Sequence, residues 1–278
     1  MRKALLVLLI GFLATPVLAL ESPWEQKLPF ENAVINYDVT GLTSGSKTIF
    51  VKDYGRTSVE YRETALKILG MKQEQKEFIL TTPDWVYTAD LVADTGTKHA
   101  NPTKFLTQEF NNLSRNDQKK VIENAEKQGV SMLEGVNGAI EKNAAEILGY
   151  SCDKATMMGT VVYTIHGTEL PLKVESNTMG MKLNEIATGI KKGRVDASKF
   201  ELPSSISFIH DKQADQMVQA QAKTIIQHLV SGQPVVNTAP AGSQPQGMNS
   251  DESQQKLLNP EQQQQFQNMM KMFGGQSN

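Results

Sequence analysis

The most regular pattern in the sequence is an alternation of apolar and polar residues between positions 33 and 41. Ala33, Ile35, Tyr37 and Val39 fall on one side of this alternation. Successive side chains of a β-strand point to opposite faces of a sheet, so this spacing predicts a strand with one buried face.

Shorter alternating runs follow, separated by residues that favour turns. Thr-Ser-Gly-Ser at 43–46 and Thr-Pro-Asp at 82–84 each predict a turn, and Gly167-Thr168 predicts a hairpin. Strands joined by tight turns pair as antiparallel hairpins, so these segments predict a β-meander. The predicted strands are 33–41, 47–54, 57–64, 77–81 and 85–92, followed by 146–152, 160–166, 170–176, 180–190 and 205–209.

Helical periodicity appears twice, once between the two groups of strands and once after the last strand. Residues 102–128 begin with Pro102 and place apolar residues three and four positions apart, which predicts a helical insertion with Ser114 as an N-cap. Residues 211–231 carry a second apolar stripe and stop at Gly232, a residue typical of helix ends.

The C-terminal part has a different composition. Residues 232–259 have no aromatic residue and are rich in Gly, Pro, Gln, Ser and Asn, so they predict a flexible linker. A short amphipathic helix is predicted at 260–275. Because an isolated helix of this length is marginal in water, we expect it to need a partner surface. Its apolar stripe, the predicted partner-binding part of the tail, consists of Phe266, Met269, Met270 and Phe273.

The N-terminus has the layout of a secretory signal peptide. Arg2 and Lys3 precede the apolar run 4–14, and Val17-Leu18-Ala19 supplies a small-residue cleavage site. The run is too short to span a bilayer, which takes about 20 residues as a helix. We therefore expect export, with cleavage after Ala19 and no membrane-spanning segment in the mature chain. The cleavage site has no cysteine, so lipidation is not expected.

Composition limits the classes of partner. The 30 acidic residues slightly outnumber the 28 basic ones, and the pI is about 6.1. A nucleic-acid-binding protein or a protein held on membranes by a basic surface usually carries a strong positive field. The sequence therefore predicts no nucleic-acid partner and no polybasic membrane contact.

Short catalytic and metal-binding motifs are missing from the sequence. It contains no phosphate-binding glycine loop, no nucleophile elbow and no paired metal-ligand spacing around its histidines, His99, His166, His210 and His228. No catalytic residue, metal or cofactor is therefore predicted, and a hydrolase is the least favoured function.

Cys152 is the single cysteine and allows three interpretations. A free cysteine usually behaves as a small buried hydrophobe. It also suits an intermolecular disulfide in an oxidising compartment, or catalysis if Lys154 lowered its pKa. Burial is the interpretation that we favour.

The order of the segments resembles that of the bacterial periplasmic lipoprotein-carrier superfamily, the LolA/LolB-like proteins. The resemblance rests on the exported meander, the helical insertion, Leu148-Gly149-Tyr150-Ser151-Cys152, Leu170-Pro171-Leu172-Lys173 and Phe200-Glu201-Leu202-Pro203. It implies a curved antiparallel sheet, an incomplete β-barrel, with helices over one face and an apolar cavity for acyl chains. No functional residue of that superfamily is matched individually.

The sequence thus predicts an α+β domain over residues 20–231, soluble in the periplasm. The expected function is non-enzymatic binding or carriage of an apolar ligand, such as a lipid or an acylated protein. The alternative is a structural or regulatory envelope protein that binds a protein partner through its tail. Six residues are candidates for the cavity, with core packing as the alternative for each: Tyr37, Tyr61, Trp85, Tyr87, Tyr163 and Ile165.

Overall fold

The structure, a computed structural model, describes residues 20–25, 27–68, 71–134, 138–178 and 181–234. The chain divides into two units, Met1–Val235 and Val236–Asn278, and all the described residues belong to the first. The predicted leader 1–19, the predicted tail helix 260–275 and nearly all of the predicted linker lie outside the described residues.

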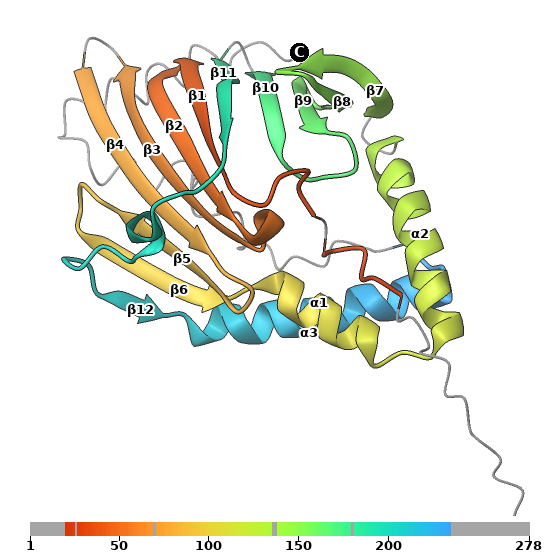
Figure 1. The fold of residues 1–278 in the computed structure, drawn as a ribbon. Coiled ribbons are helices and arrows are strands. Elements are labelled where there is room, and N and C mark those ends of the chain that lie inside the picture. Colours follow the sequence, from red (N-terminus) through yellow and green to blue (C-terminus); the bar gives the residue numbers. More distant parts are fainter. Residues whose placement is uncertain (1–19, 26, 69–70, 135–137, 179–180, 235–278) are drawn as a thin grey trace, which may run out of the picture. The chain divides into compact units, whose positions relative to one another are not determined.

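One 12-stranded sheet contains all the strands of the described residues. It is antiparallel except where β12 pairs with β6, and its two edge strands, β12 and β7, do not pair with each other. The sheet is therefore curved and open (Figure 1). The strands are β1 (Ala33–Gly41), β2 (Thr43–Lys52), β3 (Thr57–Ile68), β4 (Met71–Thr81), β5 (Trp85–Asp90), β6 (Thr95–Ala100), β7 (Ala139–Ile147), β8 (Tyr150–Met157), β9 (Thr160–Ile165), β10 (Pro171–Thr178), β11 (Met181–Lys192) and β12 (Phe208–His210).

The sheet consists of two meanders joined through their inner strands. β1 to β6 pair in sequence order, as do β7 to β11, and β1 pairs with β11. Register shifts occur between Asn36 and Tyr37 in β1, and between Pro171 and Lys173 in β10. Such bulges bend a strand and increase its twist, which suits the curvature of this sheet.

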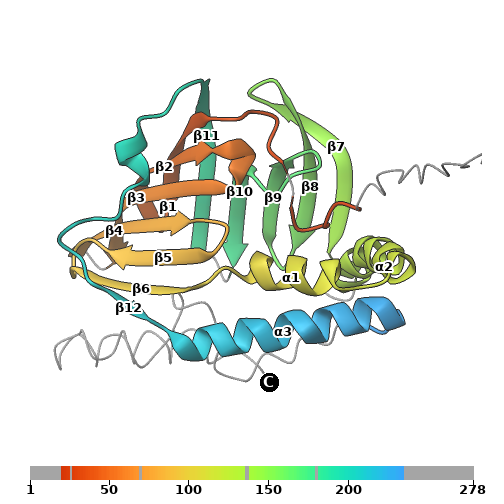
Figure 2. The ribbon, with the colours of Figure 1, turned by 60° about the horizontal axis from the view of Figure 1, so that its bottom comes forward.

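Three helices and two short 3-10 turns complete the fold of the described residues. α1 (Pro102–Asn111) and α2 (Arg115–Glu134) carry the chain from β6, the neighbour of edge strand β12, to β7 at the opposite edge of the curved sheet (Figure 2). α3 (Lys212–Ser231) packs against α1, α2 and β6. The 3-10 turns are η1 (Asp53–Gly55) and η2 (Ala197–Phe200).

Side-chain caps fix the helix ends that the sequence predicts. The Asn101 side chain accepts a hydrogen bond from the Thr103 amide at the start of α1, and Ser114 Oγ accepts one from the Asp117 amide before α2. Gly232 ends α3 in the left-handed conformation, with φ of 70°. Each cap satisfies a backbone or terminal group that the helix itself leaves unpaired.

Apolar side chains of the described residues form three clusters. The first lies on the inner, concave face of the sheet and includes Ile35, Tyr37 and Val51, with Phe30 from the N-terminal segment. The second lies on the outer face, where the segment after β11 covers β3 to β5. The third joins the helices to Leu20 and Trp24. The alternation predicted for 33–41 is confirmed, since its four apolar residues are all buried.

Two local predictions are wrong. The turn predicted at 43–46 is part of β2, and the chain reverses instead at Gly41 and Leu42. The single strand predicted at 146–152 is two strands, β7 and β8, with the turn at Leu148 and Gly149. In addition, the sequence did not predict β6.

Candidate functional site

Cross-strand pairing arranges the inner face of the sheet in rows. One row runs Val51, Ser58 and Thr81 across β2, β3 and β4. The next row contains Ile49, Glu60 and Ile79, and a third contains Lys47, Arg62 and Glu77. Period-two alternation places every second residue of each strand on this face, so polar and apolar groups lie side by side.

A cavity of about 740 Å³ lies over the first two rows. Its walls come from residues 24, 25, 27 and 28 of the N-terminal segment, from α1, and from the hairpin between β9 and β10. This volume lies within the range of about 300 to 1,000 Å³ that is typical of small-molecule sites.

The cavity has an apolar floor. Ile49 and Val51 are buried, and Ile79 is half-buried. Leu28 and Leu170 add apolar surface from the N-terminal segment and the β9–β10 hairpin. Apolar area of this kind stabilises a bound hydrocarbon by about 25 cal/mol per Å² removed from water.

Charged side chains surround this floor, and most of them are already paired. Lys104 Nζ lies 2.7 Å from Asp84 Oδ1. Glu60 Oε1 lies 3.2 Å from Arg62 Nη2. Glu25 and Glu169 are exposed at the edge of the cavity.

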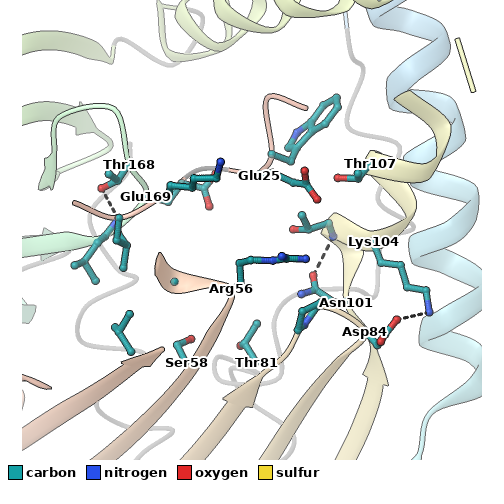
Figure 3. A pocket seen from close by; sticks show the side chains of 18 of the residues that line it. Glu25, Arg56, Ser58, Thr81, Asp84, Asn101, Lys104, Thr107, Thr168 and Glu169 are labelled. Carbon is teal, nitrogen blue, oxygen red and sulfur yellow. Dashed lines mark hydrogen bonds and ion pairs between the residues drawn. The ribbon is translucent and has the colours of Figure 1, made fainter. Parts of the chain in front are cut away.

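Arg56 differs from the other cations of the cavity. Its side chain extends into the space between the N-terminal segment and Asn101 (Figure 3), and among the described residues it has no ion pair or side-chain hydrogen bond. Ser58 and Thr81 lie directly opposite each other on β3 and β4, and within the same described part their hydroxyls have no hydrogen bond. The cavity thus offers a free guanidinium and two free hydroxyls beside apolar surface.

A buried ionic network lies next to the cavity in the third row. Glu185 of β11 accepts hydrogen bonds from Lys47 and from Arg62, and both Glu185 and Lys47 are buried. Burial opposes ionisation of Glu185, but the hydrogen bonds and charges of Arg62 and Lys47 outweigh it and hold the pKa of this carboxyl below its usual range. Lys47 also lies over the ring of Tyr37, 4.4 Å from its centroid.

The six residues proposed from the sequence for a cavity are not brought together. Tyr37 is buried on the inner face, where its hydroxyl donates a hydrogen bond to the Pro171 carbonyl at 2.9 Å. Burial raises the pKa of Tyr37, and the charges of Glu60 and Glu185 add to this effect. Ile165 is buried in the same cluster, and Tyr163 packs against it.

The other three belong to the opposite face or its edge. Tyr61 packs edge-on against Phe78, and Tyr87 against Phe208, with ring centroids 5.1 and 5.5 Å apart. The Trp85 ring lies 5.2 Å from that of His210. None of the six lines the 740 Å³ cavity. Five of them belong to the apolar clusters, and Trp85 packs against His210 instead.

Sequence reasoning missed the residues that do line the cavity. Arg56 and Lys104 belong to a turn and a helix start, and no local motif distinguishes them. Ser58 and Glu60 of the lining do alternate along one strand with Arg62 of the next row, and that alternation is the only signal that could have placed them on one face.

The cysteine and two histidines have structural surroundings. Cys152 has no exposed surface, and burial raises the pKa of its thiol, so the interpretation as a buried cysteine is confirmed. His210 Nε2 lies 2.6 Å from Asp215 Oδ2, and the other oxygen of this carboxylate accepts a hydrogen bond from the Ala100 amide, which ties α3 to β6. His166 pairs with Asp153 on the surface.

Two kinds of feature are absent from the described part of the chain. No group of three or more His, Cys, Asp or Glu residues there has the geometry to hold a metal ion. None of the described helices is both long and apolar enough for a membrane span.

No protein-family model matches this chain, and no curated protein matches it either. Among solved structures, an uncharacterised conserved protein from Thermus thermophilus is similar, with a TM-score of 0.38 and 9% identity over 65% of this chain and 91% of that one. PNGF-II is similar with a TM-score of 0.31 and 13% identity, over 72% of this chain and 33% of that one. The resemblance to lipoprotein carriers therefore stays a prediction from sequence.

Proposed function

We propose that this protein is a non-enzymatic periplasmic binding protein, or carrier, for a lipid-like amphiphile. The observation that carries the proposal is the cavity on the concave face, with an apolar floor of Ile49, Val51 and Ile79 beside Arg56, which has no ion pair within the described residues. In this proposal the sheet acts as an incomplete barrel, and α1 covers its inner face. The resemblance to the lipoprotein-carrier superfamily gives independent support.

The chemistry of the cavity supports an amphiphilic ligand. An acyl chain gains about 0.8 kcal/mol for each CH₂ that it buries, which favours hydrocarbon on the floor. A carboxylate or phosphate on the same ligand would accept charge-assisted hydrogen bonds from Arg56, and Ser58 and Thr81 could donate to it as well. A ligand with both parts satisfies the site better than a purely apolar one.

A binding experiment with two matched probes tests the proposal. We expect oleate to displace a fluorescent fatty acid from the protein about 10- to 100-fold more effectively than uncharged oleyl alcohol, because a hydrogen bond to a charged group is worth about 1.5 to 3 kcal/mol. Arg56→Gln should abolish this preference and leave alcohol binding unchanged.

Substitutions on the two faces of the sheet supply the control. Ile79→Trp should fill the cavity and weaken the binding of both probes. Ile186→Trp, at an exposed position on the outer face, should weaken the binding of neither. If the wild-type protein binds neither probe and carries no lipid when purified from its native envelope, the proposal is wrong. A consistently empty protein that copurifies with a stoichiometric partner would instead support the partner-binding function.

A further inference from the structure

A second concave surface lies outside the cavity, at the end of the sheet where β1 begins and β11 ends. It is a groove of about 470 Å³ between the N-terminal segment and the segment that follows β11. We call it the basic groove, because Lys52, Lys192 and Arg194 line it against a single acidic residue, Glu31.

Two more cations flank the groove, so that five gather at this end of the sheet. Lys191 precedes Lys192 at the end of β11, and Lys199 lies in η2 with its Nζ 5.7 Å from the centroid of Phe50. Lys52 ends β2, which is two strands from β11, a separation of about 10 Å.

The charge of this cluster is only partly offset within the described residues, by Glu31 in the groove and by Asp196. None of the five cations has an ion pair there, and all five are exposed. Asp196 lies close to Arg194 and Lys199, but its side chain caps η2 by accepting a hydrogen bond from the Ser198 amide. The chain as a whole carries a formal charge of −2, so this gathering of basic residues is local to this end of the sheet.

The form of the groove favours an extended anionic surface over a single small anion or a nucleic acid. Its cations are exposed side chains on separate elements, which do not converge as a built pocket for one phosphate would require. Its two aromatic residues, Phe30 and Phe200, belong to apolar clusters on the two faces of the sheet, and so offer no platform for stacking bases. Clusters of four to eight Lys and Arg residues are typical of proteins that contact anionic membranes.

We infer that the basic groove docks this protein on an anionic phospholipid membrane. The location suits delivery or pickup of a ligand, since Leu28 lines the cavity and the next residue, Pro29, lines the groove. The inference goes beyond the proposed function: docking depends on surface charge alone and holds whatever the cavity binds. It departs from the expectation, drawn from overall charge, of no basic membrane contact.

Vesicle binding tests the inference. We expect the mature chain to sediment with vesicles of equal parts phosphatidylglycerol and phosphatidylcholine, and not with vesicles of phosphatidylcholine alone. Binding should weaken as ionic strength rises, because salt screens exposed charges. The triple variant Lys52→Gln, Lys192→Gln, Arg194→Gln should bind the anionic vesicles about 100-fold more weakly, the equivalent of about 3 kcal/mol.

A matched control variant tests whether vesicle binding depends on the charge of the basic groove or on the overall charge of the protein. Lys119→Gln, Lys127→Gln and Lys223→Gln remove the same charge from exposed positions on α2 and α3, and should bind the anionic vesicles as the wild type does. The thermal melting of both variants checks that they fold. The inference is overturned if the wild type ignores anionic vesicles, if both variants lose binding equally, or if soluble glycerol phosphate or an acidic peptide binds the groove while vesicles do not.

Discussion

Glu185 is the residue whose charge the fold depends on most directly. It lies buried between Lys47 and Arg62, and both of them donate hydrogen bonds to its carboxylate. Glu185→Gln keeps the shape of the side chain but leaves the Lys47 ammonium buried without a counter-charge. Breaking a buried ion pair in this way costs about 3 to 5 kcal/mol, so urea denaturation should show a loss of that size. Glu175→Gln, which breaks the half-exposed pair with Lys173, should cost less than about 1 kcal/mol.

The same residue predicts a pH dependence with a defined sign. Although burial opposes its ionisation, Arg62 and Lys47 hold the pKa of Glu185 in the folded protein below its usual value of 4.5. Its contribution to stability is therefore fully present above about pH 4.5 and is lost as the pH falls through the folded pKa. The difference in unfolding free energy between wild type and Glu185→Gln should shrink over that acidic range. A constant difference would contradict the assigned role.

Residue-level predictions from sequence succeeded where one strand carried the information and failed where several elements combine. The alternation at 33–41 identified a buried face, because a strand has only two faces and burial follows from its own pattern. The partners of Arg62 lie on β3 and on β11, far apart in sequence. Likewise the five cations at the basic groove come from residues 52 and 191–199, and averaging charge over the chain conceals them.

At the scale of strands, Gly45 shows why a turn-like sequence became part of a long strand. It pairs with Thr64 in the β2–β3 ladder, and a Cβ on Gly45 would lie 2.0 Å from the Glu63 carbonyl oxygen. Its φ of 156° is also unfavourable for other residues. The glycine thus allows a close approach of two backbones. Together with its polar neighbours Thr43, Ser44 and Ser46, it matches the sequence pattern of a turn, and for this reason the strand was not predicted here.

Gly45→Ala therefore tests this close approach. It should destabilise the protein by about 1 to 3 kcal/mol or more, because the backbone must shift to accommodate the methyl group. Gly189→Ala is the matched control: it lies in β11, where an added Cβ would have nothing within 4 Å, and should be neutral or stabilising by about 0.4 to 1 kcal/mol. Thermal and urea unfolding measure both. Equal effects of the two substitutions would show that the β2–β3 contact does not constrain Gly45.

At the scale of the whole molecule, the fold class was predictable from the sequence, but the pairing that joins the two meanders was not. The meanders and the helical insertion follow from local periodicity, so an α+β fold with an antiparallel sheet was predicted and is found. Pairing of β1 with β11, which joins the two meanders, links segments about 150 residues apart and leaves no local signal. The cavity depends on that pairing and on the N-terminal segment, and so it became visible only in three dimensions.

Whole-molecule organisation also predicts the effect of removing the C-terminal unit. The three apolar clusters are built from residues between 20 and 230, and the last described contacts, such as the Gln128 side chain on the Gln233 carbonyl, end before residue 235. Deleting 236–278 should therefore leave the melting temperature and cavity binding unchanged, since no part of those clusters is lost. If the tail acts through a partner, the deletion should abolish copurification of that partner from envelope extracts. The variant Phe266→Ser, Met269→Ser, Met270→Ser, Phe273→Ser should also lose the copurified partner, although its chain keeps its full length. A lower melting temperature in the truncated chain would show that the tail stabilises the first unit instead.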